Sequence, residues 1–274
     1  MPATGCRSTR GGRKPRHRSL RPARALASPA AVAQVADVVF TVVTASADSE
    51  QVALGAQGII EGARAGTVVV DMATISPLAT RHIAQALAAR GIDHVDAPVS
   101  GGPTGAQGAA LSIMAGGEPQ VFERVRPLFE CLGKTILHMG DHGAGQVTKA
   151  CNQLVLTVTL QAVAEALLLA QRCGVDAAKV REAMLGGFAA SRVLELFGKR
   201  MVERNFENGI DARLYHKDLH IVLDLAHGLG LPVPAAAVTL QQINALVGSG
   251  GGKSDFSRMI EVLERAAGGS MRQP

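Results

Sequence analysis

The pattern of apolar residues changes near residue 142, and this change limits the folds open to the chain. Before it, short β-branched runs alternate with helical patterns, which predicts strands at 37–43, 66–74, 93–102, 109–117 and 134–140. Helices between nearly continuous apolar strands are typical of a parallel sheet covered on both faces. After Gly143 a long helix is predicted over 144–173, and helical periodicity continues to about residue 267 without a strand.

The chain is therefore predicted to contain an α/β part followed by an all-α part. We expect an atypical basic tail at 1–25, a sheet domain at 26–142 and a helical domain at 143–268. Ligands of open α/β sheets bind beyond the carboxyl ends of the strands, which here lead to the junction of the two parts. A cleft between the parts is the expected site.

The excess positive charge belongs to the tail. The net charge is +5, but residues 1–36 hold eight Arg or Lys and no acid, which leaves 20 basic against 23 acidic residues elsewhere. The chain has seven Phe, one Tyr and no Trp, so it lacks the aromatic platforms that bind single-stranded nucleic acid. We expect no nucleic-acid partner.

The spacing of cysteines, histidines and apolar residues indicates neither a metal site nor a membrane span. The four cysteines lack CxxC spacing, which predicts reduced, mostly buried thiols in a reducing compartment. His216 and His220 are four residues apart but no third ligand is in view, so no metal is expected. No apolar stretch of a signal peptide follows the N-terminal charges, and polar residues from Lys149 to Glu165 interrupt the long helix. The prediction is a cytoplasmic protein without a membrane partner.

The stretch "DAPVSGGPTGAQGAALSIMAGG" at 96–117 indicates a binding turn. Ser100, Gly101 and Gly102 follow a predicted strand. Glycines expose backbone N–H groups, and no Cβ prevents a ligand from approaching them. The turn is suited to a carboxylate, although a simple glycine turn between two strands would look the same.

The stretch "GQVTKACNQLV" at 145–155 places Lys149, Asn152 and Gln153 near the start of the long helix. Residues three and four apart share one helix face. Either these three side chains face water, or they form a site. In a cleft, partial desolvation would lower the pKa of the lysine towards neutrality, where it can donate and accept a proton.

These two stretches, followed by "YHKDL" at 215–219, resemble the β-hydroxyacid dehydrogenase family in order and spacing over about residues 26–268. The resemblance implies a Rossmann-like domain at 26–142 that binds NAD or NADP, and a helical substrate and dimerisation domain at 143–268. It implies a homo-oligomer, either a dimer or a tetramer.

The same resemblance implies a role for each motif residue. Lys149 is implied as the catalytic proton donor. Ser100, Gly101, Gly102, Asn152 and Gln153 are implied to hold the substrate.

Cofactor contacts are also implied by the resemblance. Thr74, after the strand "VVVDM", is expected near the nicotinamide, and Lys217 of the KDL motif is expected to close over the cofactor. Val43 lies in the loop after "DVVFT", where the family usually has Met-Leu-Pro. We assign Val43 to the cofactor site on that position.

The spacing around Lys149 also points to a substrate. Asn three and Gln four residues after the lysine are similar to the tartronate semialdehyde reductases of the family. This implies reduction of 2-hydroxy-3-oxopropanoate to glycerate by a nicotinamide cofactor. Oxidation of 3-hydroxyisobutyrate is the alternative within the family.

The expected glycine fingerprint is missing. No GxGxxG turn occurs before residue 28, so the first βαβ unit of the sheet is missing or replaced, and the choice between NAD and NADP cannot be predicted. We hypothesise that a wrong start or a shifted reading frame produced the basic tail. A truncated, non-catalytic scaffold or binding protein is the alternative from another functional class.

Overall fold

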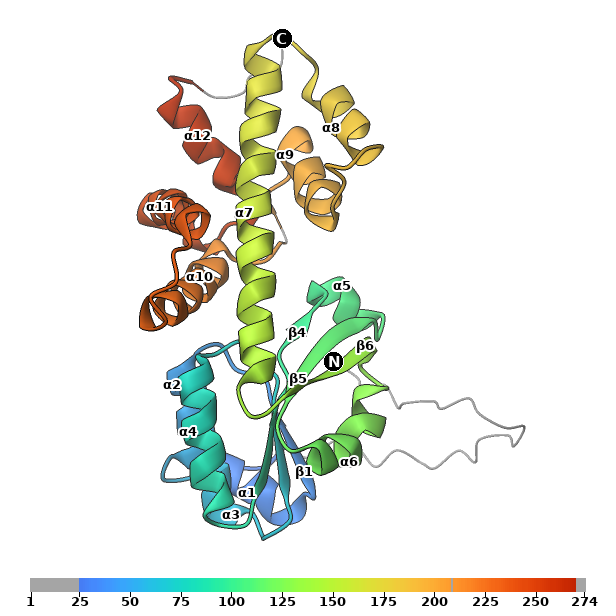
Figure 1. The fold of residues 1–274 in the computed structure, drawn as a ribbon, viewed down its shortest axis with the longest axis vertical. Coiled ribbons are helices and arrows are strands. Elements are labelled where there is room, and N and C mark those ends of the chain that lie inside the picture. Colours follow the sequence, from blue (N-terminus) through green and yellow to red (C-terminus); the bar gives the residue numbers. More distant parts are fainter. Residues whose placement is uncertain (1–24, 208, 270–274) are drawn as a thin grey trace, which may run out of the picture. The chain divides into compact units, whose positions relative to one another are not determined.

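The computed structural model describes residues 25–207 and 209–269, so the predicted basic tail lies almost wholly outside the described residues. The chain divides into two compact units, with the boundary between Val147 and Thr148. Figure 1 shows the elements of both units, and each unit is described here by itself.

The first unit is built on one sheet. Its strands are β1 Val38–Thr41, β2 Val68–Asp71, β3 Asp93–Asp96, β4 Val99–Ser100, β5 Leu111–Gly116 and β6 Gly133–Gly140. The strand order is β1-β2-β3-β5-β4, with β6 paired to β5. The strands β1, β2 and β3 are parallel, with Thr41 opposite Asp71 and Asp71 opposite Asp96, so their carboxyl ends lie along one edge. The predicted Rossmann-like parallel sheet is confirmed for this part of the unit.

The second half of the sheet differs from the prediction. The strand predicted at 93–102 is two strands, β3 and β4, and β5 runs antiparallel to both of them. Only the pairing of β5 with β6 is parallel again. A parallel return needs a crossover across a sheet face, usually a helix, and the fourteen residues between β3 and β5 form no helix of that kind. This segment instead forms β4 and the short helix α5 (Gly102–Gln107).

Helices cover both faces of the sheet. On one face lie α1 Pro29–Val35, α2 Ser46–Leu54, α3 Ile59–Gly62 and α4 Pro77–Ala88, and on the other lies α6 Pro119–Phe129 (Figure 1). The alternation of β2 explains this, since Val69 belongs to the core under α1–α4 and Val68 and Val70 belong to the core under α6. The predicted Ser-Pro helix starts are confirmed, because the side chains of Ser28 and Ser76 accept hydrogen bonds from the first turns of α1 and α4.

The second unit is helical, as predicted. It contains most of α7 (Ala144–Arg172), followed by α8 Ala177–Leu185, a π-helical turn Leu194–Gly198, α9 Lys199–Glu203, α10 Ala212–Gly228, α11 Pro234–Gly248, 3₁₀ turns Gly251–Lys253 and Phe256–Met259, and α12 Ile260–Ala266. Its core joins α7, α10, α11 and α12 through aliphatic side chains and a stacked Tyr215–Phe256 pair. Gly174 ends α7 at a φ of +74°, a conformation that favours glycine.

Two expectations about exposure need correction. An 18-residue window of α7 has a mean hydropathy of 1.7 and is 44% buried, so by length and composition alone this helix could cross a membrane despite its polar residues. Core helices of soluble proteins pass the same test, and Leu160, Ala164 and Leu167 are fully buried in the core of the second unit. The thiols of Cys151 and Cys173 are free, as predicted, but exposed rather than buried.

Candidate active site

Lys149 lies in the second turn of α7 and is buried, with 7% of its surface exposed. Burial is the main cause that lowers its pKa to about 8, while the nearby Asp218 carboxylate raises the pKa and the Lys217 ammonium lowers it. A solvated helix face is therefore the wrong interpretation of this lysine. Its ammonium can lose and regain a proton near physiological pH, as a general acid and base must.

A polar network surrounds the charge of Asp218 on α10. Gln153 Nε2 donates to Asp218 Oδ2 over 2.6 Å, and Lys217 Nζ lies 2.9 Å from Asp218 Oδ1. Asn152 Nδ2 donates to Gln153 Oε1 over 2.7 Å. The structure thus connects the predicted residues Asn152, Gln153 and Lys217 through an acid that the sequence argument did not select.

This network qualifies the predicted role of Gln153. Its Nε2 and its Oε1 both have partners within the protein, and its side chain is only 4% exposed. The amide of Gln153 contacts Asp218, and its substrate-binding role stays a prediction. The sequence held a signal for Asp218: this acid is spaced with Tyr215 and Val222 on one face of the helix. The structure shows that this face of α10 is buried.

In the first unit, Ser100, Gly101 and Gly102 join β4 to α5. Ser100 lies opposite Ser112 of β5 and is half-buried, whereas both glycines are exposed. Gly101 has a φ of +135°, and a Cβ there would come within 3.2 Å of Leu111 Cδ2. The backbone conformation favours glycine and the space for a side chain is tight, and the turn starts a helix rather than joining two strands directly.

Thr74 and Val43 follow the carboxyl ends of β2 and β1, which are adjacent and parallel. The side chain of Asp71 joins these ends, because its Oδ1 accepts from Thr41 Oγ1 and from the backbone N–H of Ala73, each over 3.0 Å. Burial raises the pKa of Asp71, and its hydrogen bonds oppose this shift. The two predicted cofactor residues therefore leave the sheet at one edge, where dinucleotides bind in folds of this kind.

The start of α7 is attached to the same edge of the sheet. Asp96, at the end of β3, accepts from the backbone N–H of Gly143 over 2.8 Å and of Gln146 over 3.1 Å. Burial raises the pKa of Asp96, and these two hydrogen bonds are the largest opposing effects. The contact is close enough that a Cβ on Gly116 or Gly145 would lie within 2.8 Å of the Asp96 side chain.

The histidines singled out in the sequence have protein partners. His216 Nε2 lies 2.8 Å from Asn244 Oδ1, and His220 Nε2 lies 3.3 Å from His216 Nε2. Within residues 25–207 and 209–269, no three His, Cys, Asp or Glu side chains are grouped as a metal site.

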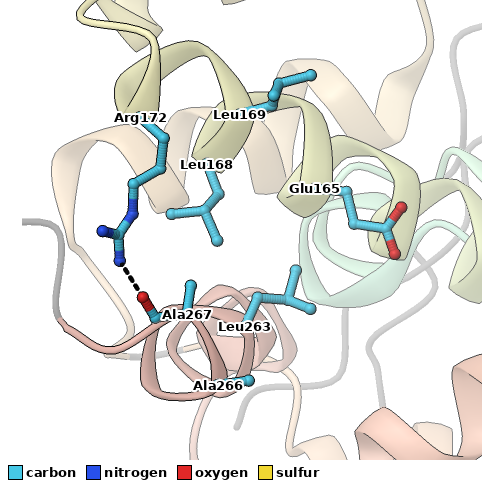
Figure 2. Close-up of a pocket in the computed structure, with 7 residues that line it drawn as sticks. All are labelled: Glu165, Leu168, Leu169, Arg172, Leu263, Ala266 and Ala267. Atoms are coloured by element: carbon cyan, nitrogen blue, oxygen red, sulfur yellow. Dashed lines mark hydrogen bonds between the residues drawn. The ribbon is translucent and has the colours of Figure 1, made fainter.

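A shallow groove of about 420 Å³ lies elsewhere in the second unit, between the carboxyl-terminal parts of α7 and α12 (Figure 2). Its lining residues are Glu165, Leu168, Leu169, Arg172, Leu263, Ala266 and Ala267. The guanidinium of Arg172 donates to the carbonyl of Ala267 over 2.8 Å, as the dashed line in Figure 2 shows. None of the predicted site residues lines this groove.

Comparisons with known proteins agree with the fold. Residues 9–140 match the NAD binding domain of 6-phosphogluconate dehydrogenase, a match that begins inside the basic tail. Residues 143–263 match the NAD-binding domain of NADP-dependent 3-hydroxyisobutyrate dehydrogenase. Together these matches and the sheet define a nicotinamide-dependent oxidoreductase.

Individual relatives narrow the class. The chain is 42% identical to the 2-hydroxy-3-oxopropionate reductase of Escherichia coli, over 86% of this chain and 81% of that protein. It is similar to the structure of 3-hydroxyisobutyrate dehydrogenase from Salmonella typhimurium, with 29% identity, a TM-score of 0.79, and coverage of 86% and 82% of the two chains. The corresponding enzyme of Mycobacterium tuberculosis, solved with L-serine, gives 30% identity, a TM-score of 0.77, and coverage of 86% and 81%. The chain belongs to the β-hydroxyacid dehydrogenase family and is an NAD(P)-dependent hydroxyacid oxidoreductase.

Proposed function

We propose that this protein reduces 2-hydroxy-3-oxopropanoate to glycerate with NADH or NADPH, and that Lys149 donates the proton. The observation that carries this proposal is the buried Lys149 ammonium, whose pKa of about 8 lies near the working range of a general acid. The 42% identity to a 2-hydroxy-3-oxopropionate reductase and the Asn152–Gln153 pair support this substrate.

The proposed reaction combines the transfer of a hydride with the transfer of a proton. The nicotinamide, when bound, supplies a hydride to the carbonyl carbon of the substrate. The carbonyl oxygen gains negative charge, and Lys149 Nζ transfers a proton to it, which leaves a neutral amine that solvent protonates again. In the oxidative direction the neutral amine accepts the hydroxyl proton. The carboxylate of Asp218 favours the charged form of Lys149, so it supports the reductive direction.

The remaining site residues are proposed from the family resemblance. Ser100, Gly101 and Gly102 are proposed to bind the substrate carboxylate through the serine hydroxyl and backbone N–H groups, and Asn152 to bind a substrate hydroxyl. We propose that residues 26–142 form the NAD(P) domain and 143–268 the substrate and dimerisation domain of a homo-oligomer that is soluble and cytoplasmic.

The cofactor side of the site is supported by the first unit. Thr74 and Val43 are proposed to contact the nicotinamide part, because they follow adjacent parallel strands at the edge where dinucleotides bind. Lys217 is proposed to close over the cofactor, although its ammonium forms an ion pair with Asp218. No glycine fingerprint is present for the diphosphate in the described residues, which start at Ala25.

A second candidate is the oxidation of 3-hydroxyisobutyrate. It is favoured by the two similar structures of 3-hydroxyisobutyrate dehydrogenases, at 29% and 30% identity. Both substrates are small hydroxy acids with a carboxylate, so they make the same demands on the Ser100–Gly102 turn and on Lys149.

The deciding experiment is an assay of NADH and NADPH oxidation with tartronate semialdehyde and with methylmalonate semialdehyde. Faster turnover of tartronate semialdehyde supports the first proposal, and faster turnover of the other supports the second. Lys149→Ala serves as the control, and activity that survives this substitution contradicts the mechanism. Absence of turnover with either substrate, together with absence of cofactor binding, would favour a non-catalytic scaffold.

A further inference from the structure

We propose that Gln146 is a positioning residue for the nicotinamide cofactor, because its side-chain amide holds both peptide groups that flank Thr74. This inference rests on the proposed function, in which Thr74 contacts the cofactor. It concerns residues of the first unit only.

The side chain of Gln146 makes two hydrogen bonds to one short loop. Its Oε1 accepts from the backbone N–H of Ile75 over 3.1 Å, and its Nε2 donates to the carbonyl of Ala73 over 2.8 Å. The Ala73 carbonyl belongs to the peptide before the Cα of Thr74, and the Ile75 N–H belongs to the peptide after it. Since each peptide is planar, fixing both planes fixes the two backbone dihedral angles of Thr74.

Gln146 is itself firmly held. Its backbone N–H donates to Asp96 Oδ2 over 3.1 Å, and only 1% of its surface is exposed. The second oxygen of Asp96 accepts from Gly143, three residues earlier. The loop after β2 is therefore connected to the end of β3 through the side chains of Gln146 and Asp96, both of which are buried.

The two bonds require a glutamine at this position. One partner is a donor and the other an acceptor, and an amide is a neutral side chain that offers one of each. The opposite amide orientation would place NH₂ against N–H and oxygen against oxygen. Glutamate would keep the bond from Ile75 and lose the bond to Ala73, whereas methionine would fill the same space and lose both.

Thr74 stands where this geometry matters for a ligand. It follows β2 at the carboxyl edge of the parallel strands, and its side chain is half-buried. A loop fixed before the ligand arrives loses less conformational freedom when it binds. Releasing the loop is therefore expected to weaken cofactor binding while leaving the proton-donating group in place.

The test compares two glutamines of the same helix. Gln161 is also on α7 and is 5% exposed, but it belongs to the second unit, where its Nε2 donates to Glu165 Oε1. We would measure the dissociation constants of NADH and NADPH by fluorescence titration for the wild type, Gln146→Met and Gln161→Met, with melting temperatures for all three. Loss of two buried hydrogen bonds is expected to raise the cofactor dissociation constant at least about tenfold in Gln146→Met, against less than about twofold in Gln161→Met.

A double-mutant cycle with Thr74→Val separates positioning from general support of the fold. If Gln146 acts through Thr74, the effect of Gln146→Met on cofactor affinity is strongly reduced in the Thr74→Val background. If Gln146→Met does not fold, Gln146→Glu replaces it in the same cycle, with a smaller expected effect.

The outcomes are distinct. Equal cofactor affinities of Gln146→Met and Gln161→Met overturn the inference, and so do additive effects of Gln146→Met and Thr74→Val. In both cases the proposed function stands, provided that the wild type binds NADH or NADPH. A wild type that binds neither cofactor overturns the proposed function together with this inference. Faster hydrogen exchange at the Ile75 amide in Gln146→Met supports the clamp directly.

Discussion

Two buried acids contact α7, and they do so in different ways. Asp96, in the first unit, accepts hydrogen bonds from backbone N–H groups at the start of the helix. Asp218, in the second unit, is bonded by the side chain of Gln153 and paired with the ammonium of Lys217. The backbone contacts of Asp96 fix where the helix starts, whereas the side-chain contacts of Asp218 place charge beside Lys149.

This difference leads to an expectation for each unit. Buried ionisable groups of the first unit, such as Asp96, should affect stability and cofactor affinity, because they fix the backbone at the carboxyl edge of the sheet. Those of the second unit should affect rate and its dependence on pH. The following predictions, in order of decreasing effect, test that separation.

Replacing Lys149 should give the largest effect. Lys149→Ala is expected to lower kcat by about 10²–10⁴, the usual contribution of a general acid. Cofactor affinity and melting temperature should change little, since the removed group is a partly desolvated charge. Steady-state kinetics and cofactor titration of the same preparation check this. If cofactor affinity fell by the same factor as kcat, the proposed division between the two units would be wrong.

His94 should control stability in acid. Burial is the main cause that lowers its pKa to about 3 from 6.5, and both ring nitrogens lack a hydrogen-bond partner. Below pH 6.5 the His94 side chain is therefore protonated in the unfolded chain but stays neutral in the folded protein. The stability is fully present above that pH and falls by about 1.4 kcal/mol per pH unit towards about pH 3, so about 2 kcal/mol is lost at about pH 5.

Denaturant unfolding of His94→Leu at several pH values tests this slope. The variant should lose less stability between neutral pH and about pH 5 than the wild type. His82→Gln is the control, because His82 is 65% exposed on α4. The raised pKa values of Asp71 and Asp96 make the folded protein more stable as the pH falls. The slope due to His94 is therefore read from the difference between wild type and variant. Parallel curves for all three proteins would contradict the assignment.

Asp218→Asn should move the pH profile. Asp218 raises the pKa of Lys149, so its neutral replacement lowers that pKa below its present value of about 8. Reduction needs the protonated lysine, so the fall of rate on the alkaline side should begin at lower pH, with a loss of about tenfold near the original pKa. Asp224→Asn, an exposed acid on the same helix, is the matched control. An unchanged profile in Asp218→Asn would show that Asp218 does not set the charge of Lys149.

Gly101→Ala should give the smallest effect. An L-residue at a φ of +135° is strained, and we expect a loss of about 1 kcal/mol of stability and a higher KM for the substrate. Gly105→Ala adds a methyl group 3.3 Å from the same Leu111 Cδ2 at an ordinary φ, so it separates backbone strain from crowding. Equal losses in the two variants would mean that crowding alone requires glycine at residue 101.

The sequence predicted the parts of the molecule that depend on local pattern. Ser28 and Ser76 with their prolines gave correct helix starts, and Gly174 gave the end of α7. Lys149 was selected because it shares one helix face with Asn152 and Gln153 and lies in a motif that resembles the family, and its burial agrees with that selection. The reversal of β5 was missed because hydrophobic alternation carries no information on strand direction.

The parts of the site that were missed depend on contacts between distant residues. Asp96 bonds to residues 47 and 50 positions later, and Gln146 bonds to residues 71 and 73 positions earlier. No local pattern shows such a pair, although Gln146 lies three positions before Lys149 and extends the same polar series. Asp218 lay in a motif that had been noted only for its lysine. That Ser100, Gly101 and Gly102 bind the substrate stays a prediction.

The approach of Gly145 to its neighbours has a consequence for how the gene can vary. A Cβ at this position would lie 2.3 Å from the carbonyl oxygen of Met114 and 2.8 Å from Asp96 Oδ2. Every non-synonymous single-base change in a glycine codon that leaves a sense codon adds at least that one atom. In a library that covers all substitutions, selection for folded protein should therefore remove the variants of Gly145. Variants of Gly187, where a Cβ would meet nothing within 4 Å, should be retained.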